Sequence, residues 1–160
     1  MTENNIKKYY INMERSIDRN NNMLKYHKNI TRIEAYDGNL IHTYKNIILP
    51  KKTVQDKYQL CCSLSHLKTI FTSLKNGDSG AIIFEDDVID IYSHLWEESL
   101  NDIIKNAPNN TECIQLFPGN PKIIKENIKK KEKYVKWHKN SHGTLCYYIS
   151  NKGMKKLFSA

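Results

Sequence analysis

The sequence lacks several features that would assign it to a protein class directly. Its four cysteines contain no CxxC pair, so zinc-ribbon spacing is absent. A bridge between the adjacent Cys61 and Cys62 would be strained, and we expect all four cysteines to be reduced and mostly buried. No apolar run approaches the roughly 20 residues that cross a bilayer, and no charged start leads into an apolar stretch. These absences predict a cytoplasmic protein without a signal peptide or a transmembrane segment.

Length and charge narrow the possibilities without choosing a function. The chain has 160 residues, which predicts a single domain, residues 1–160, with room for a buried core. The sequence shows no internal repeat, linker or second domain. The net charge of +8 attracts phosphate-bearing partners of every kind, including nucleotide diphosphates, nucleic acids and anionic membranes.

Strand and helix signals alternate along the chain, which is typical of an α/β sheet. Apolar and β-branched runs predict strands at 8–12, 31–36, 80–84, 113–117 and 144–149. Apolar periodicity and capping residues predict helices at 16–27, 63–74, 95–105 and 151–158. Ser16 is the expected cap of the first helix. Residues 39–58 carry little periodicity and are predicted to form a long loop.

Three consecutive carboxylates, Glu85, Asp86 and Asp87, directly follow the apolar run at 80–84. Charge at the end of a buried strand is costly unless a cation is near, and in α/β sheets such strand ends face the ligand crevice. Residues i and i+2 of an extended segment point to the same side, so Glu85 and Asp87 can converge on one Mg²⁺ or Mn²⁺ ion. A surface turn or helix-capping cluster is the alternative interpretation of this triplet.

Five short motifs follow one another along the chain. They are Tyr10–Arg19 (YINMERSIDR), Ala35–Gly38 (AYDG), Cys61–His66 (CCSLSH), Ile82–Val88 (IIFEDDV) and Gly143–Ser150 (GTLCYYIS) with Gly153. Each motif is weak by itself, but the ordered set resembles glycosyltransferase family 25, whose EDD segment is its metal-binding carboxylate motif. The resemblance implies a GT-A-like nucleotide-sugar-binding fold, with a central mixed, mostly parallel sheet flanked by helices.

The same resemblance implies a function. Members of this family include lipooligosaccharide (lipopolysaccharide biosynthesis) and collagen sugar transferases. We therefore expect a metal-dependent enzyme that moves a hexose from a UDP-sugar donor to a glycan or protein acceptor hydroxyl. The expected cofactor is a divalent cation, Mn²⁺ ahead of Mg²⁺, held by Glu85 and Asp87. Catalysis is expected at Glu85, Asp86 and Asp87.

Candidate donor-binding residues lie in the first two motifs. Asn12 directly follows the first strand, where a nucleotide could lodge. Arg15 or Arg19 could pair with phosphate through a guanidinium fork, or could be ordinary helix-surface charge. Asp37 could accept a hydrogen bond from a base or ribose hydroxyl, although simple Asp-Gly turn chemistry is the stronger interpretation.

Further candidates lie in the third and last motifs. Ser65 and His66 are expected at a helix start, a place that favours anions. A buried, hydrogen-bonded histidine is the alternative for His66. His142 and Thr144 precede the last strand and could reach the donor phosphates or the metal. The four-residue spacing of His138 and His142 is weak evidence for a metal site without a helix.

The chain departs from the family's pattern in two places, and the second of them supports a second hypothesis. Cys61 stands where the family usually has glycine, which matters if that backbone needs a positive φ. The chain ends at Ala160, soon after the last motif, where family members usually continue towards the acceptor side. A catalytic base is not identified; Asp90 and Glu112 qualify only by residue class. A truncated relative that binds a nucleotide sugar or a glycan without turnover is therefore the second hypothesis.

The basic segment 122–139 gives a third hypothesis. Its lysines, interleaved with Tyr134 and Trp137, could hold phosphates and stack nucleic-acid bases. We favour the alternative, a solvated charged segment or hairpin whose Tyr134 and Trp137 pack inward, and expect no nucleic-acid partner. Attachment to an anionic membrane has little support, because the sequence shows no amphipathic apolar face there.

Overall fold

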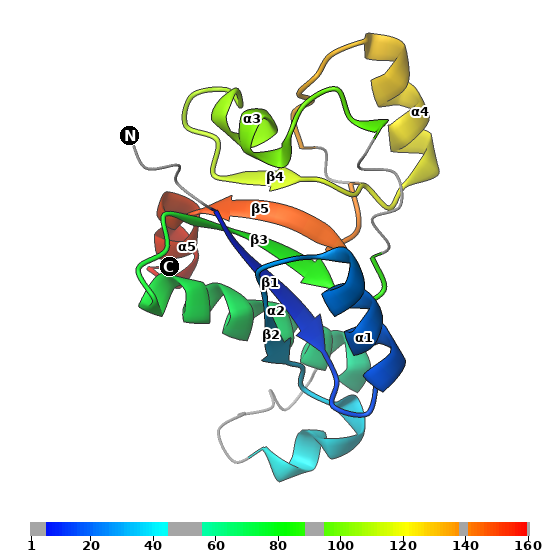
Figure 1. Cartoon of the computed structure of the whole chain (residues 1–160), viewed down its shortest axis with the longest axis vertical. Coiled ribbons are helices and arrows are strands. Elements are labelled where there is room, and N and C mark those ends of the chain that lie inside the picture. The colour runs from blue at the N-terminus through cyan, green and yellow to red at the C-terminus, as the bar shows by residue number, and fades with distance from the viewer. Residues whose placement is uncertain (1–5, 45–55, 89–94, 138–140, 160) are drawn as a thin grey trace.

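The computed structural model describes residues 6–44, 56–88, 95–137 and 141–159 (Figure 1). One five-stranded sheet has the order β2-β1-β3-β5-β4. Its strands are β1 (Lys7–Asn12), β2 (Ile30–Glu34), β3 (Gly80–Glu85), β4 (Cys113–Gln115) and β5 (Cys146–Ser150). β1 pairs in parallel with β2 and β3, whereas β5 runs antiparallel to both β3 and β4. The predicted α/β fold with a mixed, mostly parallel sheet is confirmed.

Helices cover both faces of this sheet (Figure 1). The helices of the described chain are α1 (Ile17–Tyr26), α2 (Lys57–Lys75), α3 (Leu100–Lys105), α4 (Pro121–Lys130) and α5 (Asn151–Phe158), with a short 3₁₀ helix, η1 (Gly38–Thr43); α1, α2, α3 and α5 supply the cover. One core layer joins the sheet to α2 and α5 through residues such as Ile70 and Met154. The other joins it to α1 and α3 through Met23 and Leu100.

The central strand β3 shows why the apolar run at 80–84 predicts a strand. Every residue of Gly80–Phe84 is buried. Successive side chains point to opposite faces, so Ile83 packs in the layer of α2 and α5 while Ile82 and Phe84 pack in the layer of α1. A strand covered on both faces is apolar at every position, which is the pattern that the sequence shows.

Two helix starts differ from the prediction because capping residues decide them. α2 begins at Lys57 rather than at Ser63, since the Asp56 side chain accepts a hydrogen bond from the Tyr58 amide. Part of the predicted loop at 39–58 is therefore helical, in η1 and in the first residues of α2, while 45–55 lies outside the described residues. α3 begins at Leu100, not at 95, because Ser99 caps it through the Asp102 amide.

Two further residues also differ from expectation. Ser16 stands at the N-cap position of α1 but makes no capping hydrogen bond with its side chain. Cys61 lies inside α2, fully buried in regular helix, so the position does not require the glycine usual in the family.

The cysteines are free but not mostly buried. Cys61 and Cys146 are buried, whereas Cys62 and Cys113 are exposed. The prediction of mostly buried cysteines is wrong because Cys62 lines an open cleft beside the end of β3, and Cys113 lies on β4, a strand at the edge of the sheet.

The first part of the basic segment, up to Lys130, forms helix α4. Asn120 caps it through the Lys122 amide, and Lys131 ends it with a left-handed backbone at φ 53°. The Tyr134 hydroxyl donates to the Ile103 carbonyl at 2.6 Å, which confirms inward packing of that ring. Trp137 is 53% exposed, so inward packing is wrong for the second aromatic. Across the described ranges, the structure holds no helix long and apolar enough to cross a bilayer.

Gly153 offers a test of the packing between α5 and the sheet. An added Cβ there would lie 2.7 Å from the Glu112 carbonyl oxygen, a backbone atom that cannot move aside cheaply. We expect Gly153→Ala to lower the free energy of unfolding by about 1–3 kcal/mol, the usual cost of overpacking. Helix propensity alone predicts the opposite sign, a gain of about 1 kcal/mol. Urea denaturation of Gly153→Ala decides between them, with the exposed Lys155→Ala of the same helix as the control.

Candidate functional site

The site lies at the edge of the sheet where β1 and β3 end. Ile11 pairs with Glu85 in the parallel ladder, so Asn12 and the acidic triplet emerge side by side. β5 starts at this edge because it runs antiparallel to β3, and the Glu85 amide donates to the Leu145 carbonyl at 2.8 Å. Because β5 runs antiparallel to β3, Thr144 lies next to the carboxylate of Glu85, which is 59 residues earlier in the chain.

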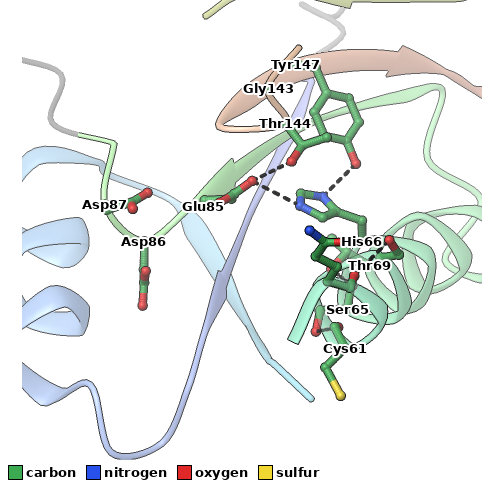
Figure 2. A network of polar contacts seen from close by, with 12 residues as sticks. Cys61, Ser65, His66, Thr69, Glu85, Asp86, Asp87, Gly143, Thr144 and Tyr147 are labelled. Atoms are coloured by element: carbon green, nitrogen blue, oxygen red, sulfur yellow. Dashed lines mark hydrogen bonds and ion pairs between the residues drawn. The ribbon is translucent and has the colours of Figure 1, made fainter. Parts of the chain in front are cut away.

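Glu85 is held from two sides (Figure 2). Its Oε1 accepts a hydrogen bond from the Thr144 hydroxyl at 2.5 Å and lies 3.3 Å from His66 Nε2. The hydrogen bond with His66 and that from Thr144 lower the pKa of Glu85, against the opposing effect of burial. Gly143, with φ at +107°, forms the turn that delivers Thr144, and its backbone passes close to Gly119. Glu85 is thus a fixed, ionised carboxylate at neutral pH.

His66 is the link between helix α2 and strand β5. Its ring is buried, and Nδ1 lies 3.1 Å from the Tyr147 hydroxyl. Burial strongly raises the pKa of Tyr147, so that hydroxyl keeps its proton. The expected location of Ser65 and His66 at a helix start is wrong, because Asp56 starts α2 well before them. His66 is instead the buried, hydrogen-bonded histidine of the alternative interpretation, directed at a carboxylate.

The Ser65 side chain makes its hydrogen bonds with backbone groups. It is buried, its hydroxyl donates to the Cys61 carbonyl at 2.7 Å, and its Oγ accepts from the Tyr36 amide at 2.9 Å. These contacts join α2 to the turn after β2.

Asp86 makes structural contacts with both of its oxygens. Oδ2 accepts from Asn12 Nδ2 at 2.7 Å, and Oδ1 accepts from Arg19 Nη1 at 2.9 Å. Asn12 is itself buried, and its Oδ1 accepts from Arg32 Nε at 2.9 Å. Asn12 and Asp86 therefore join β1, β2, α1 and the turn after β3, in agreement with the turn-cluster interpretation for this one member of the triplet.

Asp87 differs from its neighbour in exposure and charge. Its side chain is 45% exposed, with the Arg19 guanidinium 3.7 Å away. Burial of the carboxyl, followed by the negative charge of Glu85, raises the pKa of Asp87 despite the opposing Arg19. In Figure 2 the Asp86 side chain points away from Glu85. A cation beside Glu85 and Asp87 would relieve this like-charge repulsion, so these residues fit a divalent ion with oxygen ligands.

Arg15 and Asp37 form an ion pair, and both line a cleft at this end of the sheet. Asp37 also accepts from the Asn39 amide at 2.9 Å, the Asx turn that starts η1. Asp37 therefore has the turn role that the Asp-Gly pair predicts. Arg15 and Arg19 remain more than half exposed, at 54% and 52% of their side chains.

A cleft runs between these elements. It is lined from the β1–α1 turn, the turn after β2, helix α2 and the end of β3, by residues that include Met13, Arg15, Arg19, Tyr58, Cys62 and Asp87. Gly38 lies against Tyr58 in its wall: an added Cβ would lie 2.5 Å from the ring. The structure thus brings both arginines, Asp37, His66 and the acidic triplet to one cavity.

Other predicted site residues lie elsewhere. His142 is exposed, and its carbonyl accepts from the Gly119 amide at 2.9 Å, a contact that shapes the loop before β5. Glu112 pairs with Lys156 at 3.0 Å near the opposite edge of the sheet, where its carbonyl accepts from the Ser150 amide. It is therefore not placed to act as a base in the cleft. Asp90 and His138 lie outside the described residues.

Cys62 is a cleft residue that the sequence analysis does not single out. One potential ligand atom from each of Cys62, His66 and Glu85 lies within 4.8 Å of the others. Burial, and then the charges of Glu85 and Asp87, raise the pKa of the Cys62 thiol. Residues four apart share one face of a helix, so the spacing of Cys62 and His66 was an available signal. It was missed because the predicted helix began at Ser63.

The cleft lies at the carboxyl ends of the parallel strands of an α/β sheet. Open α/β proteins bind their ligands at this place, so the fold and the site define a protein of this class. Residues 5–160 match the family described as glycosyltransferase family 25 (LPS biosynthesis protein), and the chain belongs to this family. No curated protein matches the chain. The family expected from the five ordered motifs is confirmed.

Proposed function

We propose that this glycosyltransferase-family protein transfers a hexose from a UDP-linked sugar to an acceptor hydroxyl, with a divalent cation bound by Glu85 and Asp87. The observation that carries the proposal is that the three carboxylates of the triplet differ in their contacts and exposure. Asp86 has both oxygens engaged by Asn12 and Arg19, whereas the described contacts of Glu85 fall on Oε1 and Asp87 is half exposed. Glu85 and Asp87 thus keep oxygen atoms for a ligand in the lining of a cleft that also holds two arginines.

The arginines supply the complementary charge for a diphosphate. Arg19 contacts both Asp86 and Asp87 through Nη1, so its guanidinium retains other N–H groups for phosphate oxygens. Arg15 pairs with Asp37 in the lining of the cleft. Both side chains are long and half exposed, which allows them to share a phosphate with their carboxylate partners at little cost.

The cation would be held by Glu85 and Asp87, with Mn²⁺ proposed ahead of Mg²⁺. When bound, it would offset the negative charge that develops on the departing nucleotide. The chain's own part is to keep Glu85 ionised and oriented through Thr144 and His66. Asp86 fixes the turn, so that Asp87 keeps its position relative to Glu85.

The family's description as LPS biosynthesis proteins favours a glycan hydroxyl as the acceptor over a protein-linked one. A domain that binds the donor without turnover is the second candidate. It is favoured by the position of Glu112, which is paired with Lys156 near the opposite edge of the sheet and cannot act as the base in the cleft.

Calorimetric titration of UDP-glucose and UDP-galactose, with and without Mn²⁺, tests the proposal when paired with a donor-hydrolysis assay. We expect binding that requires Mn²⁺, together with slow release of the hexose to water. Metal-dependent binding without hydrolysis, and without transfer to any glycan in an acceptor screen, would favour the binding domain. Absence of binding for both sugar nucleotides would contradict the proposed UDP-sugar donor.

A further inference from the structure

We propose that Cys62, His66 and Glu85 form a second cation site, selective for a thiophilic divalent ion such as Zn²⁺. The three side chains offer a sulfur, a nitrogen and an oxygen atom that lie within 4.8 Å of one another. The proposal concerns the protein's metal chemistry and does not require that the chain transfers sugar.

The fold places these ligands on two elements that pack together. Cys62 and His66 are four residues apart on α2, and therefore lie on one face of that helix. Glu85 ends β3 opposite this face. His66 is buried at 7% exposure whereas Cys62 is exposed, so the group has a fixed inner ligand and an outer one open to the cleft.

The kinds of ligand decide which ion fits. Thiolate, imidazole and carboxylate are the three ligands that Zn²⁺ takes, at about 2.0–2.3 Å from the metal. Mg²⁺ and Mn²⁺ prefer oxygen ligands and gain little from sulfur. Three protein ligands would leave one position of a tetrahedral ion open, and all three of these residues line the cleft.

The surroundings of His66 match those of a metal-binding histidine. Ligating histidines commonly engage a partner with their second ring nitrogen, which fixes the ring and its tautomer. Here the Tyr147 hydroxyl lies 3.1 Å from Nδ1, while Nε2 is directed at Glu85 Oε1 at 3.3 Å. An ion would take the position between Nε2 and Oε1 in place of their direct contact.

Binding forms a sulfur–metal bond and releases the thiol proton of Cys62 to solvent, so affinity increases with pH. Glu85 belongs to both this site and the proposed donor-cation pair, whereas Asp87 belongs only to the latter. The two cations therefore compete for Glu85. Zn²⁺ is expected to oppose Mn²⁺-dependent binding of a sugar nucleotide.

Titration of the full chain with Co²⁺ tests the site, because a cobalt–thiolate bond gives a charge-transfer band that oxygen and nitrogen ligands do not give. We expect this band in the unaltered protein and its loss on addition of Zn²⁺. Cys62→Ser should abolish the band and weaken Zn²⁺ binding by more than about 10-fold. Mutating a residue that only supports a metal ligand already weakens affinity by about 10- to 100-fold, and Cys62 is itself a proposed ligand. Cys113→Ser, the same change at the other exposed cysteine, is the matched control and should keep the band.

Two more variants separate this site from the proposed donor site and from a merely structural role. Asp87→Asn should keep the cobalt–thiolate band. Tyr147→Phe should also keep it, with about 10- to 100-fold weaker Zn²⁺ affinity, because Tyr147 acts through His66. A missing band in the unaltered protein, or an equal band in Cys62→Ser, would overturn the proposal. The Mn²⁺-dependent titration of a UDP-sugar is a separate measurement on the unaltered protein, so failure of one proposal is distinguishable from failure of the other.

Discussion

Asp87→Asn is expected to abolish Mn²⁺-dependent binding of a UDP-sugar while leaving the fold intact. The substitution removes one of the two carboxylates proposed to hold the cation, and the amide that replaces it is a neutral, weaker ligand for a hard ion. We expect donor affinity in Mn²⁺ to fall by at least about 100-fold, which corresponds to about 2.7 kcal/mol. Calorimetry in the presence and absence of Mn²⁺ measures the loss.

The stability of this variant follows from the charge at the site. The pKa of Asp87 is raised in the folded protein, so the fold disfavours its ionised form. A group with a raised acid pKa destabilises the fold above that pKa, and its neutral replacement should leave the free energy of unfolding unchanged or higher at neutral pH. Asp18→Asn, the same change at an exposed position of α1, is the control for donor binding. Metal-dependent affinity equal to that of the control would exclude Asp87 as a ligand.

Asn12→Ala is expected to destabilise the fold rather than to act only on the ligand. Asn12 was predicted to bind the donor, but its side chain is 1% exposed and joins Asp86 to Arg32. The substitution removes the 2.7 Å hydrogen bond that Asn12 Nδ2 donates to the Asp86 carboxylate, which is only 10% exposed. Hydrogen bonds to charged groups contribute about 1.5–3 kcal/mol, so we expect a loss of about 2–3 kcal/mol in the free energy of unfolding.

Urea denaturation measures this loss, and Asn21→Ala on the exposed side of α1 is the matched control. The control should be neutral or slightly stabilising, because alanine has the higher helix propensity. Equal stability of the two variants would show that the Asn12–Asp86 contact does not stabilise the fold.

Local patterns were sufficient to predict most elements of this fold. The fully apolar run at 80–84 predicts a strand covered on both faces because only such a strand avoids polar side chains throughout. The last helix was predicted with its observed bounds, Asn151–Phe158, because its start is encoded locally: Ser150 caps it through the Gly153 amide. The acidic triplet was likewise identifiable, since it follows that buried strand directly.

Contacts across long sequence separations were not predictable in this way. The roles within the triplet depend on Asn12 and Arg19, which lie 74 and 67 residues away from Asp86. The apolar periodicity that predicts this helix begins only at about residue 63, whereas the cap is Asp56. His66 is therefore predicted at a helix start although it lies well inside α2. Cys62 was omitted for the same reason.

The sequence by itself determined the α/β class, the order of the five motifs and hence the family, because each depends on neighbours along the chain. The tertiary structure decided that, of the three carboxylates that line the cleft, Asp86 is the one engaged by both Asn12 and Arg19. It also decided that Thr144, His66 and Tyr147 act together on Glu85, because β5 runs antiparallel to β3 and α2 packs across the sheet. Strand direction and helix packing result from long-range pairing, which no local pattern of residues records.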